Sequence, residues 1–168
     1  MTDRPLWAPW RIEYIRAPKD GECIFCAAAE ADDDARVHVV ARGERCFALL
    51  NNYPYASGHV MVAPYRHVAR LDDLDDAELT ELMTLTRRCV GALEDGFGPD
   101  GFNVGINQGK TAGAGIADHL HQHVVPRWEG DTNFMPVVGS TRVLPQALAE
   151  TRSVLMAALE RRYPGRER

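Results

Sequence analysis

The stretch His119-Leu120-His121-Gln122-His123, continued by Val124-Val125-Pro126-Arg127, holds three of the chain's six histidines within five residues. In an extended strand, alternate side chains point to the same face and lie about 6–7 Å apart. The three imidazoles should therefore line one side of a strand over His119–Arg127, with the residues between them on the other side. Ordinary surface or core histidines are the plain alternative. Because imidazole titrates near neutral pH, this face is predicted to be catalytic or metal-binding.

The segments on either side of this stretch favour an α+β fold. Extended segments are predicted at Val37–Ala41, Cys46–Leu50, His59–Ala63, Phe102–Ile106 and His119–Arg127. These segments cluster and do not alternate with helices, which indicates an antiparallel sheet of about five strands. A short helical turn is predicted at 27–29.

Two longer helices are predicted in addition to these strands. One covers Asp76–Asp95, where Asp75 and Glu78 form a capping box. The other runs from about Gln146 to Arg162 and closes the chain. The apolar face of the first helix is predicted to consist of Leu79, Leu82, Met83, Thr86, Val90 and Leu93.

Composition and charge narrow the class of protein. The 168 residues are 45% hydrophobic, which suits one domain with a substantial core. The net charge of −5 argues against a protein that coats nucleic acid or an anionic membrane. No apolar run is long enough to span a bilayer, and the first ten residues lack the apolar core of a secretory signal. A cytoplasmic protein is therefore expected.

The domain organisation is predicted to be simple. No repeat or linker divides the chain, so residues 1–168 are interpreted as a single domain. Within it, residues 1–20 form an aromatic-rich N-terminal arm with Trp7, Trp10 and Tyr14. Residues 21–128 form the catalytic core, and residues 129–168 form a C-terminal extension with its helix.

The cysteines raise a separate question. Cys23 and Cys26 form a C-x-x-C pair, whereas Cys46 and Cys89 fall at expected core positions and are interpreted as inert. The pair could be a metal site, a redox couple or two small buried residues. A thioredoxin-like redox pair needs a preceding strand and a long following helix, and the sequence supplies neither.

The triad stretch, H-L-H-Q-H-V-V-P-R, resembles the motif of the histidine-triad (HIT) family. The blocks L-L-N-N-Y-P-Y-A-S-G-H-V-M-V-A-P at 49–64 and G-F-N-V-G-I-N at 101–107 resemble the family's nucleoside-binding segment and the strand before the triad loop. Residues 6–11 (L-W-A-P-W-R) and 130–134 (G-D-T-N-F) are similar to the bacterial branch related to diadenosine tetraphosphate (Ap4A) phosphorylases. The resemblance implies a HIT-like fold, paired in a homodimer.

The resemblance also implies a role for each histidine of the site. His121 would be the nucleophile that attacks the α-phosphorus, which suits a neutral imidazole because it carries no charge to repel the phosphate. The second ring nitrogen of His121 would donate a hydrogen bond to the backbone carbonyl of His119. His123 would bond the α-phosphate or the leaving oxygen, and His59 would support His121.

The substrate-binding residues follow from the same resemblance. Asn51 matches the ribose-binding position. Phosphate-binding residues are expected in the glycine-rich loop before the triad, namely Asn107, Gln108, Gly109, Lys110, Gly113 and Gly115. Many family members have Gln and then Ser/Thr before the first histidine, where this chain has Gly115-Ile116. That difference leaves room for a phosphate anion, which Lys110 and Arg127 would help to hold.

The family also implies a metal. The resemblance assigns a structural zinc to Cys23, Cys26, His67 and His119, a closed Cys2His2 set that would hold the N-terminal segment against the sheet. Because His119 and His121 lie one same-face step apart, the zinc is not expected to be catalytic, and no organic cofactor is expected.

The function expected is nucleotidyl transfer on dinucleoside polyphosphates through a covalent His–AMP intermediate, with inorganic phosphate preferred over water as acceptor. Three alternatives remain open at this stage. They are a purine-nucleoside phosphoramidase or acyl-adenylate hydrolase, a nucleotide-binding module with little turnover, and a zinc-storage or metal-sensor protein.

Overall fold

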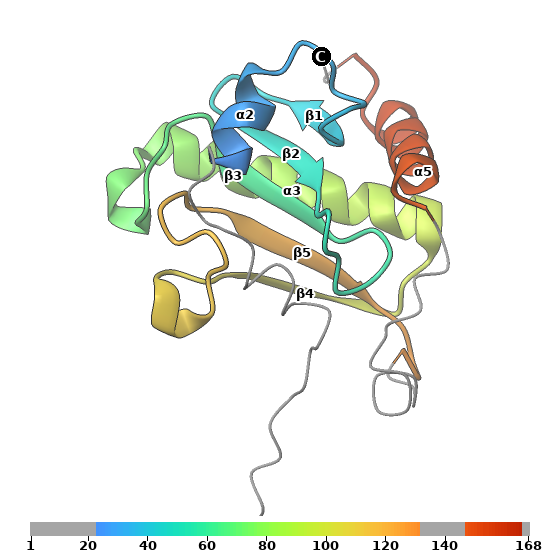
Figure 1. Ribbon diagram of the computed structural model, residues 1–168. Coiled ribbons are helices and arrows are strands. Elements are labelled where there is room, and N and C mark those ends of the chain that lie inside the picture. The colour runs from blue at the N-terminus through green and yellow to red at the C-terminus, as the bar shows by residue number, and fades with distance from the viewer. Residues whose placement is uncertain (1–22, 132–146, 166–168) are drawn as a thin grey trace, which may run out of the picture.

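Five antiparallel strands form one sheet in the order β1-β2-β3-β5-β4 (Figure 1). The computed structural model describes residues 23–131 and 147–165. The strands are β1 Val39–Arg42, β2 Cys46–Leu50, β3 Val60–Pro64, β4 Gly101–Ile106 and β5 Gln122–Arg127. This confirms the predicted α+β class and antiparallel sheet.

Helices cover both faces of this sheet. The long helix α3, Asp76–Phe97, packs along one face against β2, β3 and β5, and α5, Leu148–Arg162, packs on α3 and β1. The short helix α2, Ile24–Glu30, lies on the opposite face (Figure 1). The predicted turn at 27–29 is therefore the second half of a helix that begins at Ile24.

Strands β2 and β3 are buried along their whole length because the sheet has a helix on each face. Alternate residues separate into two clusters, as a period of two requires. Ala48, Leu50, Val60 and Val62 pack toward α3, while Phe47, Leu49, Met61 and Ala63 pack with Phe25 of α2.

The predicted capping box of α3 is confirmed. The N–H of Glu78 donates to Asp75 Oδ1 at 2.8 Å, and the N–H of Asp75 donates back to Glu78 Oε2 at 2.9 Å. The helix passes Asp95 and ends at Phe97. Gly98 caps it with φ +56°, a left-handed conformation that glycine adopts without strain.

The apolar face predicted for α3 is wrong at Met83, whose side chain is 55% exposed. Leu79 and Val90 are only partly buried. The buried stripe consists of Leu82, Leu85, Thr86, Cys89, Ala92 and Leu93. Met83 follows Leu82 by about 100° around the helix and so falls outside the stripe. Cys46 and Cys89 are fully buried, as predicted, and burial raises the pKa of the Cys46 thiol to about 12.

The predicted strand at His119–Arg127 is shorter than expected. β5 begins at Gln122, whose partner on β3 is Val62. β3 ends two residues later at Pro64, which has no N–H to continue a ladder. Residues 119–121 therefore lead into the strand without belonging to it. Gln122 and Val124 lie on the face opposite the histidines, as predicted. This face packs on α3, where Gln122 Nε2 donates to Thr86 Oγ1 at 2.7 Å.

Several predictions fall on residues outside the described ranges. These are the aromatic arm at 1–20, most of the segment 130–134 and the start of the last helix at Gln146. Within the described ranges, no helix is both long and apolar enough to cross a membrane.

Candidate active site

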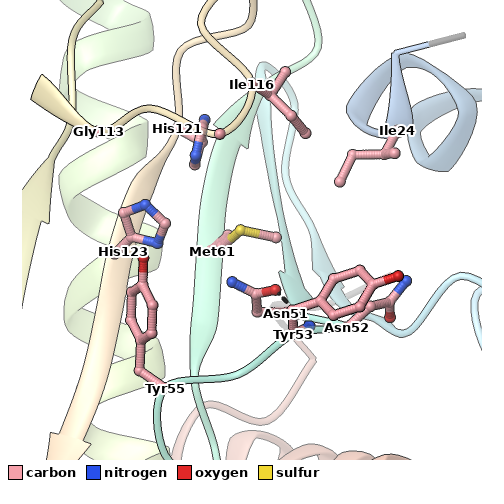
Figure 2. A pocket seen from close by; sticks show the side chains of 11 residues that line it. Ile24, Asn51, Asn52, Tyr53, Tyr55, Met61, Gly113, Ile116, His121 and His123 are labelled. Atoms are coloured by element: carbon pink, nitrogen blue, oxygen red, sulfur yellow. Dashed lines mark hydrogen bonds between the residues drawn. The ribbon is translucent and has the colours of Figure 1, made fainter. Parts of the chain in front are cut away.

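A pocket opens between β3, β5, the β2–β3 loop and the N-terminal end of α2 (Figure 2). It is lined by Ile24, Asn51, Asn52, Tyr53, Tyr55, Met61, Gly113, Gly115, Ile116, His121 and His123. The sequence-predicted His121, His123, Asn51, Gly113 and Gly115 thus meet in one place.

His121 has its two ring nitrogens distinguished by a hydrogen bond. Its Nδ1 lies 2.8 Å from the backbone oxygen of His119, so Nδ1 carries the proton and donates to that carbonyl. Nε2 is then the unprotonated nitrogen and carries the free lone pair. Only 5% of the side chain is exposed, and this burial lowers the pKa of His121 below its ordinary value of 6.5. The ring is therefore neutral near pH 7.

His59 and His123 form a second chain of hydrogen bonds. The backbone N–H of Tyr55 donates to His59 Nδ1 at 3.1 Å, which makes that nitrogen an acceptor and places the proton of a neutral ring on Nε2. His59 Nε2 lies 3.0 Å from His123 Nδ1 and donates to it. A neutral His123 therefore carries its own proton on Nε2. The sequence predicted that His59 would support His121, but the structure places its hydrogen bond on His123.

Asn51 is fixed where β2 ends. Its N–H donates to the carbonyl of His59 at 2.9 Å, and its Oδ1 accepts from the N–H of Tyr53 at 2.8 Å. This side-chain turn holds the amide at the pocket wall, with Nδ2 lying 3.5 Å from His59 Nδ1.

Only part of the glycine-rich loop lines the pocket. Among the described residues, its lining members are Gly113, Gly115 and Ile116. The chain turns back at the short helix η2, Lys110–Ala112, so Asn107, Gly109 and Lys110 stand outside the lining. Gln108 also lies outside it and uses its Oε1 to accept from the N–H of Leu71 at 2.9 Å.

Arg127 does not stand beside the loop. It lies at the far end of β5, where it forms an ion pair with Asp131 and donates to Asn103 Oδ1 at 2.8 Å. Its predicted role in holding a phosphate is therefore wrong, because the strand carries it away from the triad.

Sequence reasoning missed the apolar and aromatic walls of the pocket. They are Ile24, Tyr53, Tyr55, Met61 and Ile116. Two signals could have identified some of them. Met61 shares its strand face with His59, and Tyr53 and Tyr55 flank a proline in the loop before it.

The four predicted metal ligands also meet. One ligand atom from each of Cys23, Cys26, His67 and His119 lies within 4.8 Å of the other three. Cys23 Sγ is 3.3 Å from His119 Nδ1, and Cys26 Sγ is 3.2 Å from His67 Nδ1 and 3.6 Å from His119 Nδ1. Zinc bonds of about 2.0–2.3 Å in a tetrahedron give ligand separations of about 3.3–3.8 Å, so this donor set fits zinc.

His119 is oriented as a metal ligand. Its Nε2 lies 2.9 Å from the carbonyl oxygen of Pro64 and donates to it, which leaves Nδ1 unprotonated toward the two thiols. The side chain is fully buried, and burial lowers its pKa. The neutral ring that results is the form that binds a metal.

These observations define a histidine-triad fold and site, and a model of the HIT domain matches residues 33–130. This chain therefore belongs to the HIT-domain family. It is 43% identical over 159 residues to the AP-4-A phosphorylase of Mycobacterium tuberculosis H37Rv, which covers 89% of this chain and 81% of that protein.

Two further relatives are informative. The asymmetrical bis(5'-nucleosyl)-tetraphosphatase of Schizosaccharomyces pombe is 36% identical over 121 residues, covering 72% of this chain and 64% of that protein. The crystal structure of a Zn-bound histidine triad family protein from Mycobacterium smegmatis superposes with a TM-score of 0.68 at 28% identity. It covers 83% of this chain and 94% of the other.

Proposed function

We propose that this protein transfers a nucleotidyl group from a dinucleoside polyphosphate of the Ap4A type through a covalent bond to His121. The observation that carries the proposal is the hydrogen bond from His121 Nδ1 to the carbonyl of His119, since it makes the pocket-side Nε2 the nucleophile. The similarity to the AP-4-A phosphorylase of Mycobacterium tuberculosis supports the choice of substrate class.

In the first step, the lone pair of His121 Nε2 forms a bond to the α-phosphorus. The bond from that phosphorus to the bridging oxygen breaks, and its electrons leave with the polyphosphate. His123 donates its Nε2–H to the departing oxygen, and His59 holds His123 in the orientation required. Asn51 binds the ribose of the transferred nucleotide, and the backbone of Gly113 and Gly115 contacts the phosphates.

In the second step, an oxygen of inorganic phosphate attacks the same phosphorus and the bond to His121 breaks. The products from Ap4A are ATP in the first step and ADP in the second. Because Arg127 is paired with Asp131, the acceptor anion is held by the loop backbone near Gly115 and Ile116. These residues carry no side-chain donor, which leaves room for an anion beside the intermediate.

Product analysis with Ap4A, with and without phosphate in water enriched in oxygen-18, tests the proposal. Phosphorolysis gives ADP and ATP without label, and the rate falls steeply when phosphate is removed. Labelled AMP formed at equal rates in both buffers would show that water is the acceptor. That result would overturn the choice of phosphate as the acceptor. The role of His121 would then be tested separately, by trapping the nucleotidyl group on the protein.

We further propose that zinc occupies the Cys2His2 group and that two copies pair through β4. The zinc proposal is supported by ligand distances that suit zinc and by the Zn-bound relative.

The dimer proposal rests on the edge of the sheet. β4 is an edge strand of the described sheet with Val104 46% exposed, and a second copy would cover that edge. Light scattering coupled to size-exclusion chromatography measures the dimer directly.

A further inference from the structure

The short helix α2 and its N-cap residue Cys23 contribute residues to both the pocket and the metal-ligand group, which consists of Cys23, Cys26, His67 and His119. Cys23 and Cys26 belong to the metal group, and Ile24 between them lines the pocket (Figure 2). Phe25, the other residue between the two cysteines, is fully buried. Ile24 and Phe25, the two residues inside the C-x-x-C motif, thus have a metal-ligand cysteine on each side that fixes their positions.

The ring of Phe25 packs on two imidazoles of the triad. Its centroid lies 5.0 Å from that of His119, with the ring planes at 39°, and 4.7 Å from that of His121, at 33°. His123 meets His121 edge-on at 4.9 Å and 76°. The imidazole of His121 is therefore held by a hydrogen bond at Nδ1, by Phe25 on its face and by the ring of His123.

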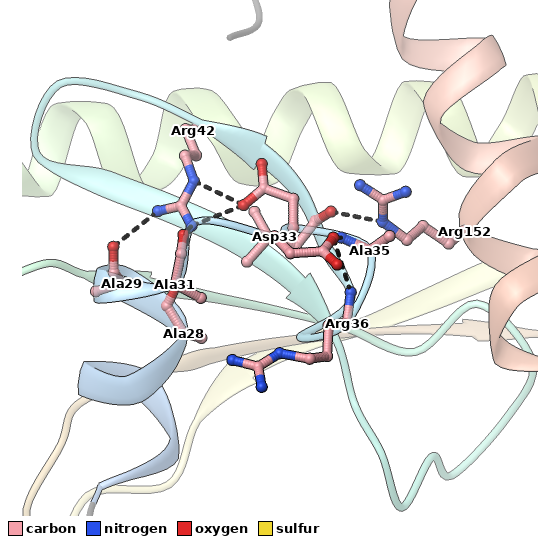
Figure 3. A network of polar contacts seen from close by, with 10 residues as sticks. Ala28, Ala29, Ala31, Asp33, Ala35, Arg36, Arg42 and Arg152 are labelled. Atoms are coloured by element: carbon pink, nitrogen blue, oxygen red, sulfur yellow. Dashed lines mark hydrogen bonds and ion pairs between the residues drawn. The ribbon is translucent and has the colours of Figure 1, made fainter.

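The position of α2 depends on contacts at its two ends. A helix of seven residues is not stable by its own hydrogen bonds, so other parts of the chain must hold it. At the C-terminal end, the guanidinium of Arg42 donates to the carbonyls of Ala28, Ala29 and Ala31 (Figure 3). At the N-terminal end, the metal-ligand group has the corresponding role, and Phe25 lies at that end.

We propose that Phe25 is a positioning residue for the nucleophile, and that the metal-ligand group sets its position. The proposal rests on the proposed function of His121. A hydrogen bond at Nδ1 fixes one edge of the imidazole but allows the ring to tilt about that bond. Contact with Phe25 limits the tilt, and hence the direction in which Nε2 approaches the phosphorus. An error of about 1 Å in such a geometry can cost a hundredfold in rate.

Phe25→Leu tests the proposal, with Phe47→Leu as its matched control. Phe47 is equally buried in the same cluster but stacks on Tyr65 at 5.1 Å, away from the histidines. Phe25→Leu should lower kcat by about tenfold to a hundredfold with KM within about twofold and the zinc content unchanged. Phe47→Leu should leave kcat near the wild-type value. Equal losses of kcat in the two variants would refute a specific role for Phe25.

A second measurement does not depend on turnover. Nitrogen-15 spectra of the His121 imidazole should show one Nδ1–H ring conformation in the wild type and in Phe47→Leu, and averaged or multiple signals in Phe25→Leu. If Phe25→Leu does not fold, Phe25→Met fills the volume without a ring and serves the same test. Unchanged His121 signals in the Phe25 variant would overturn the positioning role. A wild type with normal signals but no nucleotidyl transfer would instead refute the proposed function.

Discussion

At the residue scale, each imidazole of the site has its reactive nitrogen selected by a partner on the other nitrogen. His121 donates to the carbonyl of His119, His119 donates to the carbonyl of Pro64, and His59 accepts from the N–H of Tyr55. In these three rings, backbone groups therefore determine which nitrogen is left for the pocket, for the thiols or for another ring. His123 differs from them, because its partner is the side chain of His59.

The nucleophile assignment predicts a separation of chemistry from binding. His121→Ala should lower turnover of Ap4A by on the order of a thousandfold or more, because the covalent route is lost. The affinity for AMP should change little, since binding is proposed to rest on Asn51 and the loop backbone. Initial rates and calorimetric titration with AMP measure the two effects. Loss of AMP binding in parallel with turnover would contradict the assignment.

The hydrogen bond between His59 and His123 predicts that mutations at these two residues have coupled effects on kcat. His59→Ala should lower kcat by roughly tenfold to a hundredfold, because His123 loses the donor that orients it. In a His123→Ala background the same change should have little further effect, since the partner is already gone. Rates of the two single variants and the double variant complete the cycle. Additive losses would show that His59 acts on His121, as the sequence had predicted.

At the element scale, the first turn of α3 is fixed by a buried carboxylate. Glu78 caps the helix through Asp75 and accepts two hydrogen bonds of 2.6 Å from Arg66. The side chain of Glu78 is 4% exposed, and the Arg66 guanidinium holds its pKa down at about 2, below the ordinary value of 4.5. The pair thus connects the end of β3 to the start of α3.

The lowered pKa of Glu78 predicts that the folded protein loses stability in acid. Because the folded pKa is lower than the unfolded one, the stabilisation is complete above pH 4.5 and is lost as the pH falls toward about 2. A lowering of the pKa from 4.5 to about 2 corresponds to about 3 kcal/mol. Glu78→Gln should remove this part of the pH dependence of the free energy of unfolding. Glu160→Gln, at an exposed position on α5, is the control and should keep it.

The helices and strands also differ in how far the sequence alone could predict them. Short apolar runs bounded by turn-forming residues placed β2 correctly and β3 to within one residue, and the capping box placed the start of α3. The start of β5 could not be predicted, because it depends on where its neighbour β3 ends at Pro64. The seven residues of α2 carry too weak a local signal, because Arg42 and the metal-ligand group hold them from elsewhere in the chain.

The site was predicted unevenly for a related reason. His121 and His123 belong to the short triad motif and Asn51 to the block at 49–64, and all three line the pocket. The apolar walls come from α2 and the β2–β3 loop, whose arrangement depends on packing. The turn at Lys110–Ala112 removes half of the glycine-rich loop from the lining, and a count of glycines cannot reveal such a turn.

At the scale of the whole molecule, the metal-ligand group connects α2 to the sheet. Cys23→Ser should abolish the binding of about one zinc per chain and lower the free energy of unfolding by several kcal/mol, as removal of a structural zinc ligand does. Elemental analysis and thermal unfolding measure both. Cys89→Ala, a change in the buried core away from the group, should keep the metal. A metal-free wild type with full stability would refute the zinc proposal.

The separation of these ligands along the chain also determines the order in which the protein can assemble. Cys26 and His119 are 93 positions apart, and nearly the whole sheet lies between them. During synthesis, both cysteines and His67 leave the ribosome long before His119, so the emerging chain holds an incomplete site. Joining ends so far apart is entropically costly until the sheet has formed, and the sheet is complete only once β5, which follows His119, has paired with β3 and β4. With zinc bound as proposed, metal capture is expected to follow folding of the sheet, and a chelator should arrest maturation at a compact intermediate in which α2 is not yet docked.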